Sequence, residues 1–160
     1  MATQPPPPAA GNKDYRIRPL KRGDRDAAFK ILAADGWPVA ANDQELAISW
    51  VVQHPEIECF VAHDVAAFSR LFGMITMSHR PQLKLGGRVA SIDLFLIIPD
   101  QRHKGIGHDL LEQALRRAEA LGCKRVEMLL PEPRDERHAF FEGYGFVNNG
   151  YDLYVKAKSG

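Results

Sequence analysis

Cysteine is scarce in this chain of 160 residues, and neither Cys59 nor Cys123 lies in a CxxC or Cys/His ligand spacing. The sequence therefore offers no recognisable zinc site, and we expect no bound metal. Isolated thiols suit a reducing compartment, so we expect a cytoplasmic protein whose cysteines are buried or half-buried. A disulfide between the two stays an open alternative at this point.

Long apolar runs are also missing, because no stretch reaches the ~20 residues that a membrane-spanning helix needs. The opening residues, MATQPPPPAAGNK, lack the apolar segment of a secretory signal. Their proline run predicts a disordered tail over residues 1–13, with a PxxP ligand as the alternative. We expect a single domain over residues 14–158 and no membrane partner.

An excess of charge of one sign is absent as well. The chain has 21 Lys and Arg against 20 Asp and Glu, a formal net charge of +1. No global field therefore draws it toward nucleic acid. The basic run YRIRPLKRGDR at residues 15–25 lacks interleaved aromatics, so we interpret it as a solvated face instead of a nucleic-acid-binding module.

What the sequence does contain is an alternation of strand and helix patterns. We expect strands over residues 15–20, 57–64, 71–79, 88–98 and 125–130, and two more on either side of the Asn149-Gly150 turn. We expect helices over residues 25–34, 44–53, 107–121 and 135–142, with Asp24, Asp43 and Asp135 as N-caps and Gly122 ending the third.

The strand–helix–strand run over residues 88–130 predicts two parallel strands, since a helical crossover returns the chain in the same direction. The other strands should be antiparallel. The predicted fold class is α/β (α+β), with a mixed, mostly antiparallel central sheet of 6–7 strands and flanking helices.

The segment IIPDQRHKGIGHDLL, residues 97–111, places three basic side chains and two glycines before a helix. Backbone N–H groups at a helix start attract anions, and Gly105 and Gly107 let a phosphate approach closely. Leu110 stands where a dinucleotide-binding fingerprint needs its third glycine, and no Walker motif is present. The segment predicts a diphosphate cradle; a loop with glycines for turn geometry alone is the alternative.

Residues 92–122, IDLFLIIPDQRHKGIGHDLLEQALRRAEALG, resemble the acetyl-CoA-binding segment of the GNAT family of N-acetyltransferases. The family pattern is [Q/R]-x-x-G-x-[G/A] after a strand that ends in Val/Ile-x-Pro-Asp. IRPLKRGD at residues 17–24 and AFFEGYGF at residues 139–146 resemble its first strand and its late helix. The resemblance implies acetyl-CoA as co-substrate and a splayed parallel pair at strands 88–98 and 125–130.

The resemblance also implies which residues bind the cofactor. The backbone of Ile97, and of Leu96, should pair with the pantetheine arm. The pyrophosphate should be held by Arg102, His103, Lys104, Gly105, Ile106, Gly107 and His108. Arg134 stands where many members have an asparagine that touches the cofactor, and Phe141 where they have a tyrosine. For Arg102 and Lys104, solvated loop charges are the alternative.

Acetyl transfer to an amine needs a base, and Asp93 is an acid within an apolar strand. Some family members, polyamine acetyltransferases among them, carry a functional acid there, and Ser91 should face the same side. An ion pair with Arg88 or partial solvation is the alternative. Because Phe141 cannot donate a proton, Tyr144 is the candidate acid for the leaving thiolate, although packing is the ordinary role of such a tyrosine.

The acceptor should bind near the loop between the first two helices. Trp37 is flanked by Asp35 and Asp43, so it suits a cationic amine, while a tryptophan that anchors the loop on the core is the alternative. His79 is a second candidate for the same cleft, and Trp50 should be core.

We expect an N-acetyltransferase that moves acetyl from acetyl-CoA directly to a primary amine of a small molecule or peptide. The competing hypothesis is a non-catalytic acyl-CoA-binding sensor. A homodimer stays open.

Overall fold

The computed structural model describes residues 13–131, 134–151 and 153–157. These residues fall into two compact units, a larger one that ends at Leu129 and a smaller one that begins at Leu130, and each is described by itself. The larger unit holds five strands and three α-helices, and the smaller unit holds α4 (Glu136–Gly143). Apart from Lys13, the predicted Pro-rich tail lies outside the described residues.

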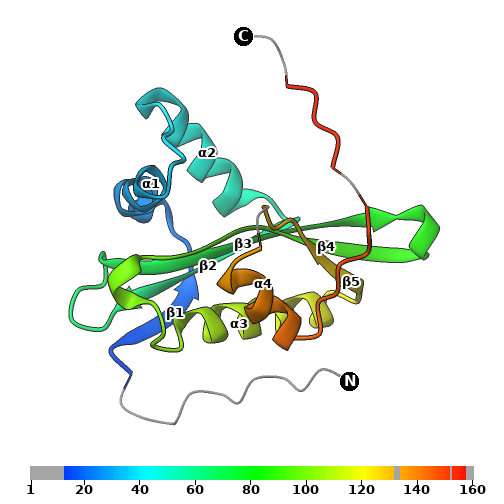
Figure 1. Cartoon of the computed structure of the whole chain (residues 1–160). Helices are drawn as coiled ribbons and strands as arrows, with labels where there is room; N and C mark the ends of the chain where they lie inside the picture. The colour runs from blue at the N-terminus through cyan, green and yellow to red at the C-terminus, as the bar shows by residue number, and fades with distance from the viewer. Residues whose placement is uncertain (1–12, 132–133, 152, 158–160) are drawn as a thin grey trace. The chain divides into compact units, whose positions relative to one another are not determined.

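A mixed five-stranded sheet forms the centre of the larger unit (Figure 1). Its strands are β1 (Tyr15–Pro19), β2 (Ile57–Asp64), β3 (Leu71–Gln82), β4 (Gly87–Ile97) and β5 (Cys123–Met128). Their order in the sheet is their order in the chain. The first four strands are antiparallel to their neighbours, while β5 runs parallel to β4. The predicted mixed sheet and its parallel pair are confirmed.

The helices of this unit divide between the two faces of the sheet (Figure 1). On one face lie α1 (Arg25–Ala34) and α2 (Ala41–Gln53), and on the other lies α3 (Ile106–Ala120), which connects β4 to β5. Among the described residues, no helix is long and apolar enough to cross a membrane. The crossover through α3 is what makes the last two strands parallel.

Helix termini follow the sequence signals in part. Gly122 has φ +71° and ends α3 as predicted. Asp43 lies in the first turn of α2, so its prediction as an N-cap is wrong. Asp24 stands at the N-cap of α1, but its carboxylate accepts bonds from the Arg18 guanidinium at 2.7 and 2.8 Å and from the Lys21 N–H at 2.8 Å. Burial would raise the pKa of Asp24, but the hydrogen bonds from Arg18 and Lys21 outweigh it and lower that pKa.

The predicted count of six or seven strands is wrong for the described residues, which form five. Described residues from Phe146 to 157 form no strand, although Gly150 has φ +73° and its N–H donates to Asn148 Oδ1 at 2.8 Å. Local turn chemistry is therefore present without a hairpin. The two strands of a hairpin are stable only when they bury an apolar face. Here the apolar side chains on either side of the turn are not buried, since Val147 is 84% exposed and Tyr154 is 90% exposed.

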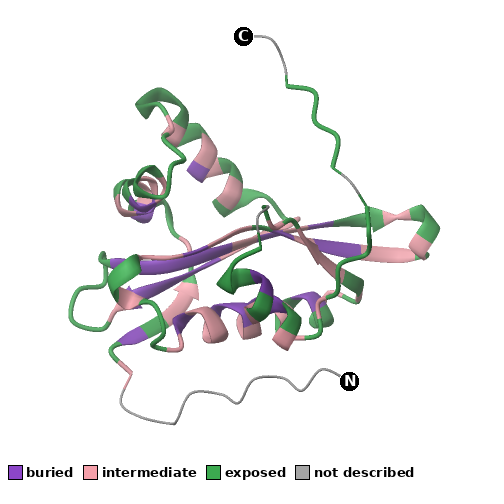
Figure 2. Ribbon diagram, viewed as in Figure 1, coloured by how far each residue is buried: buried purple, intermediate pink, exposed green. Residues whose placement is uncertain are grey.

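The apolar core of the larger unit lies on both faces of the sheet (Figure 2). Under α1 it consists of Ala28, Ile31, Val61, Leu71, Met74 and Leu96. On the opposite face, α3 buries Leu110, Leu111, Ala114 and Ala118, the spacing of an amphipathic helix. The prediction that Trp50 belongs to the core is wrong, because its side chain is 61% exposed on α2. Helical periodicity places it on a face without showing what covers that face.

Gly73 of β3 sits where the sheet has no room for a side chain. It pairs with Ile97, and a Cβ added there would come within 2.7 Å of the Leu96 carbonyl oxygen and 2.9 Å of Ile97 Cδ1. Gly73→Ala should therefore lower the free energy of unfolding by about 1–3 kcal/mol, measured by urea denaturation.

Gly23→Ala is the matched control, because nothing lies within 4 Å of a Cβ at that position. It should leave the unfolding free energy within about 0.5 kcal/mol of the wild type or raise it slightly. Equal urea midpoints for the two variants would show that the close approach of β3 and β4 does not require glycine at position 73.

Candidate functional site

Parallel pairing of β4 with β5 stops partway along β4. The last pair in the register joins Ile92 to Met128, and β4 continues from Asp93 to Ile97. We call these residues the β4 extension. On the other side, the extension pairs with β3 up to Ile97 opposite Gly73. One edge of β4 is therefore paired with β3 up to Ile97. The other edge is paired with β5 only as far as Ile92.

A β-bulge marks the place where the extension begins. Met77 of β3 pairs with Ile92 and Thr76 pairs with Leu94, so Asp93 has no partner residue on β3. The extra residue bends the strand and shifts the alternation of its side chains by one position. The expectation that Ser91 and Asp93 face the same side assumed regular alternation, which this bulge interrupts.

The carbonyl of Ile97 points away from β3. The N–H of the next residue, Ile98, donates to the Phe72 carbonyl on β3 at 2.9 Å. Hydrogen-bonding direction alternates along an antiparallel strand, so the Ile97 carbonyl faces the outer edge, where the Arg102 Nε–H donates to it at 3.1 Å. Leu96 faces β3 by the same rule, and its side chain lies in the core cluster. The register thus favours Ile97 over Leu96 for pairing with a ligand.

The glycine-containing loop follows the extension directly. A 3-10 turn, Pro99–Gln101, ends β4, and α3 begins at Ile106. His103 has φ +63° and Gly105 has φ +91°, so two residues of the loop adopt left-handed backbone shortly before the helix. Left-handed residues in such a loop can turn backbone N–H groups toward one side, an arrangement that favours anions. The positive end of the α3 dipole adds to that preference.

The side chains of this loop have different surroundings. Arg102, His103 and Lys104 are exposed, and the Lys104 ammonium donates to the Gln101 side chain at 3.3 Å. Ile106 is fully buried and fixes the start of α3, so only its backbone could serve a ligand. Gly107 and His108 are half-buried in the first turn of the helix. The predicted cradle residues are thus brought together at one helix terminus.

A partly buried polar contact that the sequence did not indicate holds this terminus in place. Asp109, in the first turn of α3, accepts hydrogen bonds from Lys13 Nζ at 2.7 Å and from Tyr15 Oη at 2.6 Å. Burial would raise the pKa of Asp109, but these two donors lower it overall. Burial and the bond to Asp109 raise the pKa of Tyr15, so the phenol stays a donor. An acid in a helix's first turn was the available signal, but its partners are distant in sequence.

Two predicted residues, Asp93 and Trp37, are both exposed. Asp93 is exposed at the bulge, and the alternative pairing with Arg88 does not occur, because Arg88 pairs with Glu56 at 3.2 Å. Trp37 is 64% exposed in the loop after α1, so it does not anchor that loop on the core. The catalytic role of Asp93 and the acceptor role of Trp37 stay predictions.

His79 is a buried group with unmet hydrogen-bonding capacity. Its side chain is 3% exposed, and neither ring nitrogen has a hydrogen-bond partner in the described part of the chain. Burial lowers its pKa, and the charge of Arg88 lowers it further, while Glu58 and Glu56 act in the opposite direction. Its predicted place in the acceptor cleft stays a prediction.

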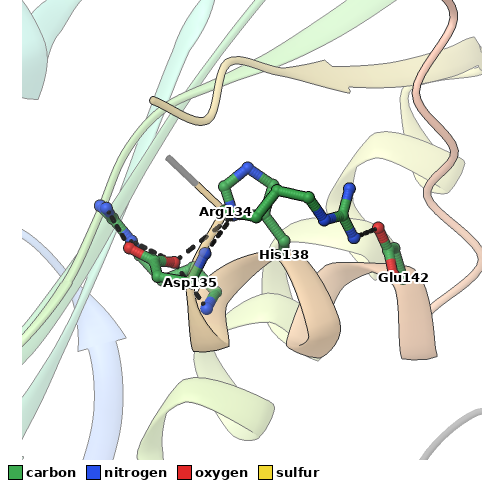
Figure 3. A network of polar contacts seen from close by, with 5 residues as sticks. Arg134, Asp135, His138 and Glu142 are labelled. Atoms are coloured by element: carbon green, nitrogen blue, oxygen red, sulfur yellow. Dashed lines mark hydrogen bonds and ion pairs between the residues drawn. The ribbon is translucent and has the colours of Figure 1, made fainter. Parts of the chain in front are cut away.

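The smaller unit carries a local polar network at α4 (Figure 3). Asp135 caps the helix as predicted and accepts from the Arg137 N–H at 2.9 Å. His138 Nδ1 accepts from the Asp135 N–H at 3.1 Å, so this histidine is a capping residue. Arg134 binds the Glu142 carboxylate. Hydrogen bonds from Arg137 are the main reason why the pKa of Asp135 is lowered.

Phe141 and Tyr144 belong to the aromatic part of the same unit. Phe141 is 1% exposed, and its ring lies 5.4 Å from that of Phe146 in an edge-to-face arrangement. The Tyr144 ring lies 5.3 Å from that of Phe140. The cofactor roles of Arg134 and Phe141 and the acid role of Tyr144 stay predictions. Within the described residues, no group of three or more His, Cys, Asp or Glu side chains is arranged to hold a metal.

One comparison with known proteins identifies a family. A sequence model for the Acetyltransferase (GNAT) family matches residues 25–146. A comparison with curated proteins found no match.

Solved structures resemble the chain over most of its length. An acetyltransferase from Trypanosoma brucei has a TM-score of 0.76 at 19% identity, covering 90% of this chain and 100% of that chain. An aminoglycoside 6′-N-acetyltransferase from Acinetobacter baumannii has a TM-score of 0.72 at 18% identity, covering 91% of this chain and 99% of that chain. A transcriptional regulator from Bacillus halodurans has a TM-score of 0.81 at 22% identity, covering 89% of this chain and 99% of that chain. At these identities the likeness establishes the fold.

The unpartnered ring of His79 should make stability depend on pH. A histidine whose folded-state pKa is lowered stabilises the fold fully above its unfolded pKa of about 6.5, and this contribution is lost as the pH falls below that value. His79→Leu should remove a slope of at most about 1.4 kcal/mol per pH unit from the unfolding free energy between pH 7 and 5.5. Urea denaturation at stepped pH measures it.

His54→Gln is the control, because His54 is exposed at the end of α2. It should keep the wild-type slope even if it changes the absolute stability. A His79→Leu variant with the wild-type slope would mean that the His79 ring has a proton-accepting partner in solution.

Proposed function

The chain belongs to the GNAT family of acetyltransferases, and on that premise we propose that it transfers an acetyl group from acetyl-CoA to a primary amine. The observation that carries the proposal is the β4 extension, which continues beyond the last pair with β5 at Ile92 and leads directly into the glycine-containing loop at the start of α3. A ligand with an amide-containing arm and a diphosphate has both partners there in sequence. The pantetheine arm and diphosphate of CoA have that order.

The loop would bind the diphosphate through the backbone N–H groups of residues 102–107, with help from His108. Arg102 and Lys104 would contribute positive charge from the exposed side of the loop. Ile97 would pair with a pantetheine amide through its outward carbonyl. Asp109, held by Lys13 and Tyr15, would keep the first turn of α3 fixed while the ligand binds.

The chemistry would proceed by direct attack of the amine on the thioester carbonyl. A free alkylammonium has a pKa near ~10, so it must lose a proton before it can attack. Asp93, exposed at the bulge, is the proposed base, acting directly or through a water molecule. A C–N bond forms, the C–S bond breaks, and the departing thiolate takes up a proton. Tyr144 is the proposed donor of that proton.

The acceptor is proposed to be a small-molecule or peptide amine. Trp37 is exposed and lies between Asp35 and Asp43 in the chain, which suits a cationic group beside an aromatic ring. We also propose a cytoplasmic location, which the two free cysteines, Cys59 and Cys123, support.

A non-catalytic acyl-CoA-binding protein is the second candidate. It is favoured by Phe141, which stands where members of the family carry a tyrosine and which cannot donate a proton. Cofactor binding without turnover on any amine would favour this alternative.

Calorimetric titration with acetyl-CoA, CoA, ATP and NAD tests the cofactor assignment. We expect micromolar binding of the two CoA compounds and none of ATP or NAD. Gly105→Glu should weaken CoA binding by about a hundredfold, because hydrogen bonds to a charged group contribute about 1.5–3 kcal/mol and the new carboxylate repels phosphate.

Gly122→Glu is the matched control, since Gly122 also has positive φ but lies at the opposite end of α3. It likewise places a side chain and a negative charge at a residue with positive φ, and it should keep wild-type affinity. If Gly105→Glu also binds CoA normally, the loop is not the diphosphate site; if the wild type does not bind CoA, the proposed function is wrong.

The base assignment predicts a rate effect that depends on pH. Asp93→Asn should lower kcat by about 10²–10⁴-fold near neutral pH while leaving the affinity for CoA unchanged. The deficit should shrink as the pH approaches ~10, where the amine deprotonates in solution. The assay uses acetyl-CoA with the best acceptor found among polyamines, aminoglycosides and lysine peptides.

Asp100→Asn is the control, because Asp100 is an exposed acid just after the β4 extension. It should change neither kcat nor its pH profile. An Asp93→Asn enzyme with wild-type turnover at every pH would remove Asp93 from the mechanism.

A further inference from the structure

The outward carbonyl of Ile97 already has a hydrogen-bond donor. Arg102, the first residue of the loop, reaches back along the outer edge of β4 and donates its Nε–H to this oxygen at 3.1 Å. Its backbone is extended, with φ −69° and ψ 156°, and the N–H of Arg102 bonds the Pro99 carbonyl at 3.4 Å. The side chain thus lies along the strand edge instead of over the concave side of the loop.

That edge is the place where the proposed function requires the pantetheine arm. β5 pairs with β4 only as far as Ile92, and the backbone of Ile97 faces outward at the end of the extension. An arm that forms a strand-like pair with Ile97 must approach its carbonyl from the outer edge, where the guanidinium lies. The arm and the Arg102 side chain therefore compete for one position.

Resting on the proposed function, we propose that Arg102 is a specificity-determining residue that occupies the outer edge of β4 until CoA displaces it. Once displaced, the guanidinium sits at the mouth of the anion-binding loop and can pair with the diphosphate. The bond broken at Ile97 is then replaced by a charge-assisted bond to phosphate.

The exchange makes binding depend on both parts of the ligand. Pantetheine alone must break the Arg102–Ile97 bond and gives the guanidinium no anion in return. Complete CoA breaks the same bond and supplies the anion. Arg102 should therefore weaken the binding of pantetheine and strengthen that of CoA, so that it selects for the intact cofactor.

The test is calorimetric titration of the full-length protein and its Arg102→Ala variant with CoA and with pantetheine. The variant should bind pantetheine about three- to tenfold more tightly and CoA about three- to tenfold more weakly, the range for one hydrogen bond or exposed ionic contact. Opposite signs for the two ligands are the result that a merely structural role for Arg102 would not produce.

Lys104→Ala is the matched control, because Lys104 is a neighbouring cation whose ammonium bonds the Gln101 side chain and not β4. It should weaken CoA binding modestly and leave pantetheine binding unchanged. Thermal unfolding of all three proteins should give equal midpoints, which shows that the loop variants keep the fold.

A second measurement covers pantetheine affinities too low for calorimetry. In the free protein, the NMR resonance of the Arg102 Nε–H should be protected from solvent exchange, and saturating CoA should shift it. Arg102→Ala with unchanged pantetheine affinity, or an Arg102 resonance that CoA leaves in place, would overturn the proposal while the proposed function stands. A wild type that binds no CoA would instead refute the proposed function.

Discussion

The early end of parallel pairing between β4 and β5 is the constraint on which the candidate site depends. Pairing with β5 stops at Ile92, and the next residue, Asp93, forms a β-bulge in the pairing of β4 with β3. The strand then continues to Ile97 with β3 on one side only, and a short turn delivers the chain to the start of α3. The outward carbonyl of Ile97 and the backbone N–H groups of the loop consequently follow one another directly along the chain. A ligand that is amide-like at one end and anionic at the other fits that order.

Two contacts hold this part of the chain in place. At one end, Gly73 allows β3 to approach Leu96 and Ile97 more closely than any side chain would permit. At the other end, Asp109 ties the first turn of α3 to Tyr15 and Lys13 at the beginning of the described chain. The first contact holds β4 against β3 before the loop, and the second holds α3 against β1 after it. Preorganised backbone donors lose little freedom when they bind an anion, so under the proposed function this rigidity would favour affinity for the diphosphate.

The sequence predicted the regular elements of the larger unit well, because each carried its own local signal. The limits of α1 and β2 agree with the predicted limits, and the periodicity of α3 and its terminal Gly122 identified the helix that makes β5 parallel. Features that depend on contacts between distant segments of the chain could not be predicted from local patterns. Tyr15 and Asp109 are far apart in the chain, the bulge at Asp93 depends on the register with β3, and the exposure of Trp50 depends on what covers α2. The Asn149-Gly150 turn shows the converse, since its local chemistry is present without the strands that it usually joins.

The bulge also affects how molecules of this protein behave toward one another. The outer edge of a strand is a template on which a strand of another molecule can add, and apolar edges such as Leu94–Ile97 are the most prone to it. Asp93 interrupts that template with a bent backbone and an exposed carboxylate, which an added strand would have to bury without a partner. The bulge at Asp93 thus opposes edge-to-edge aggregation along the strand edge that β5 stops covering at Ile92. One residue therefore protects the edge that the proposed ligand would use.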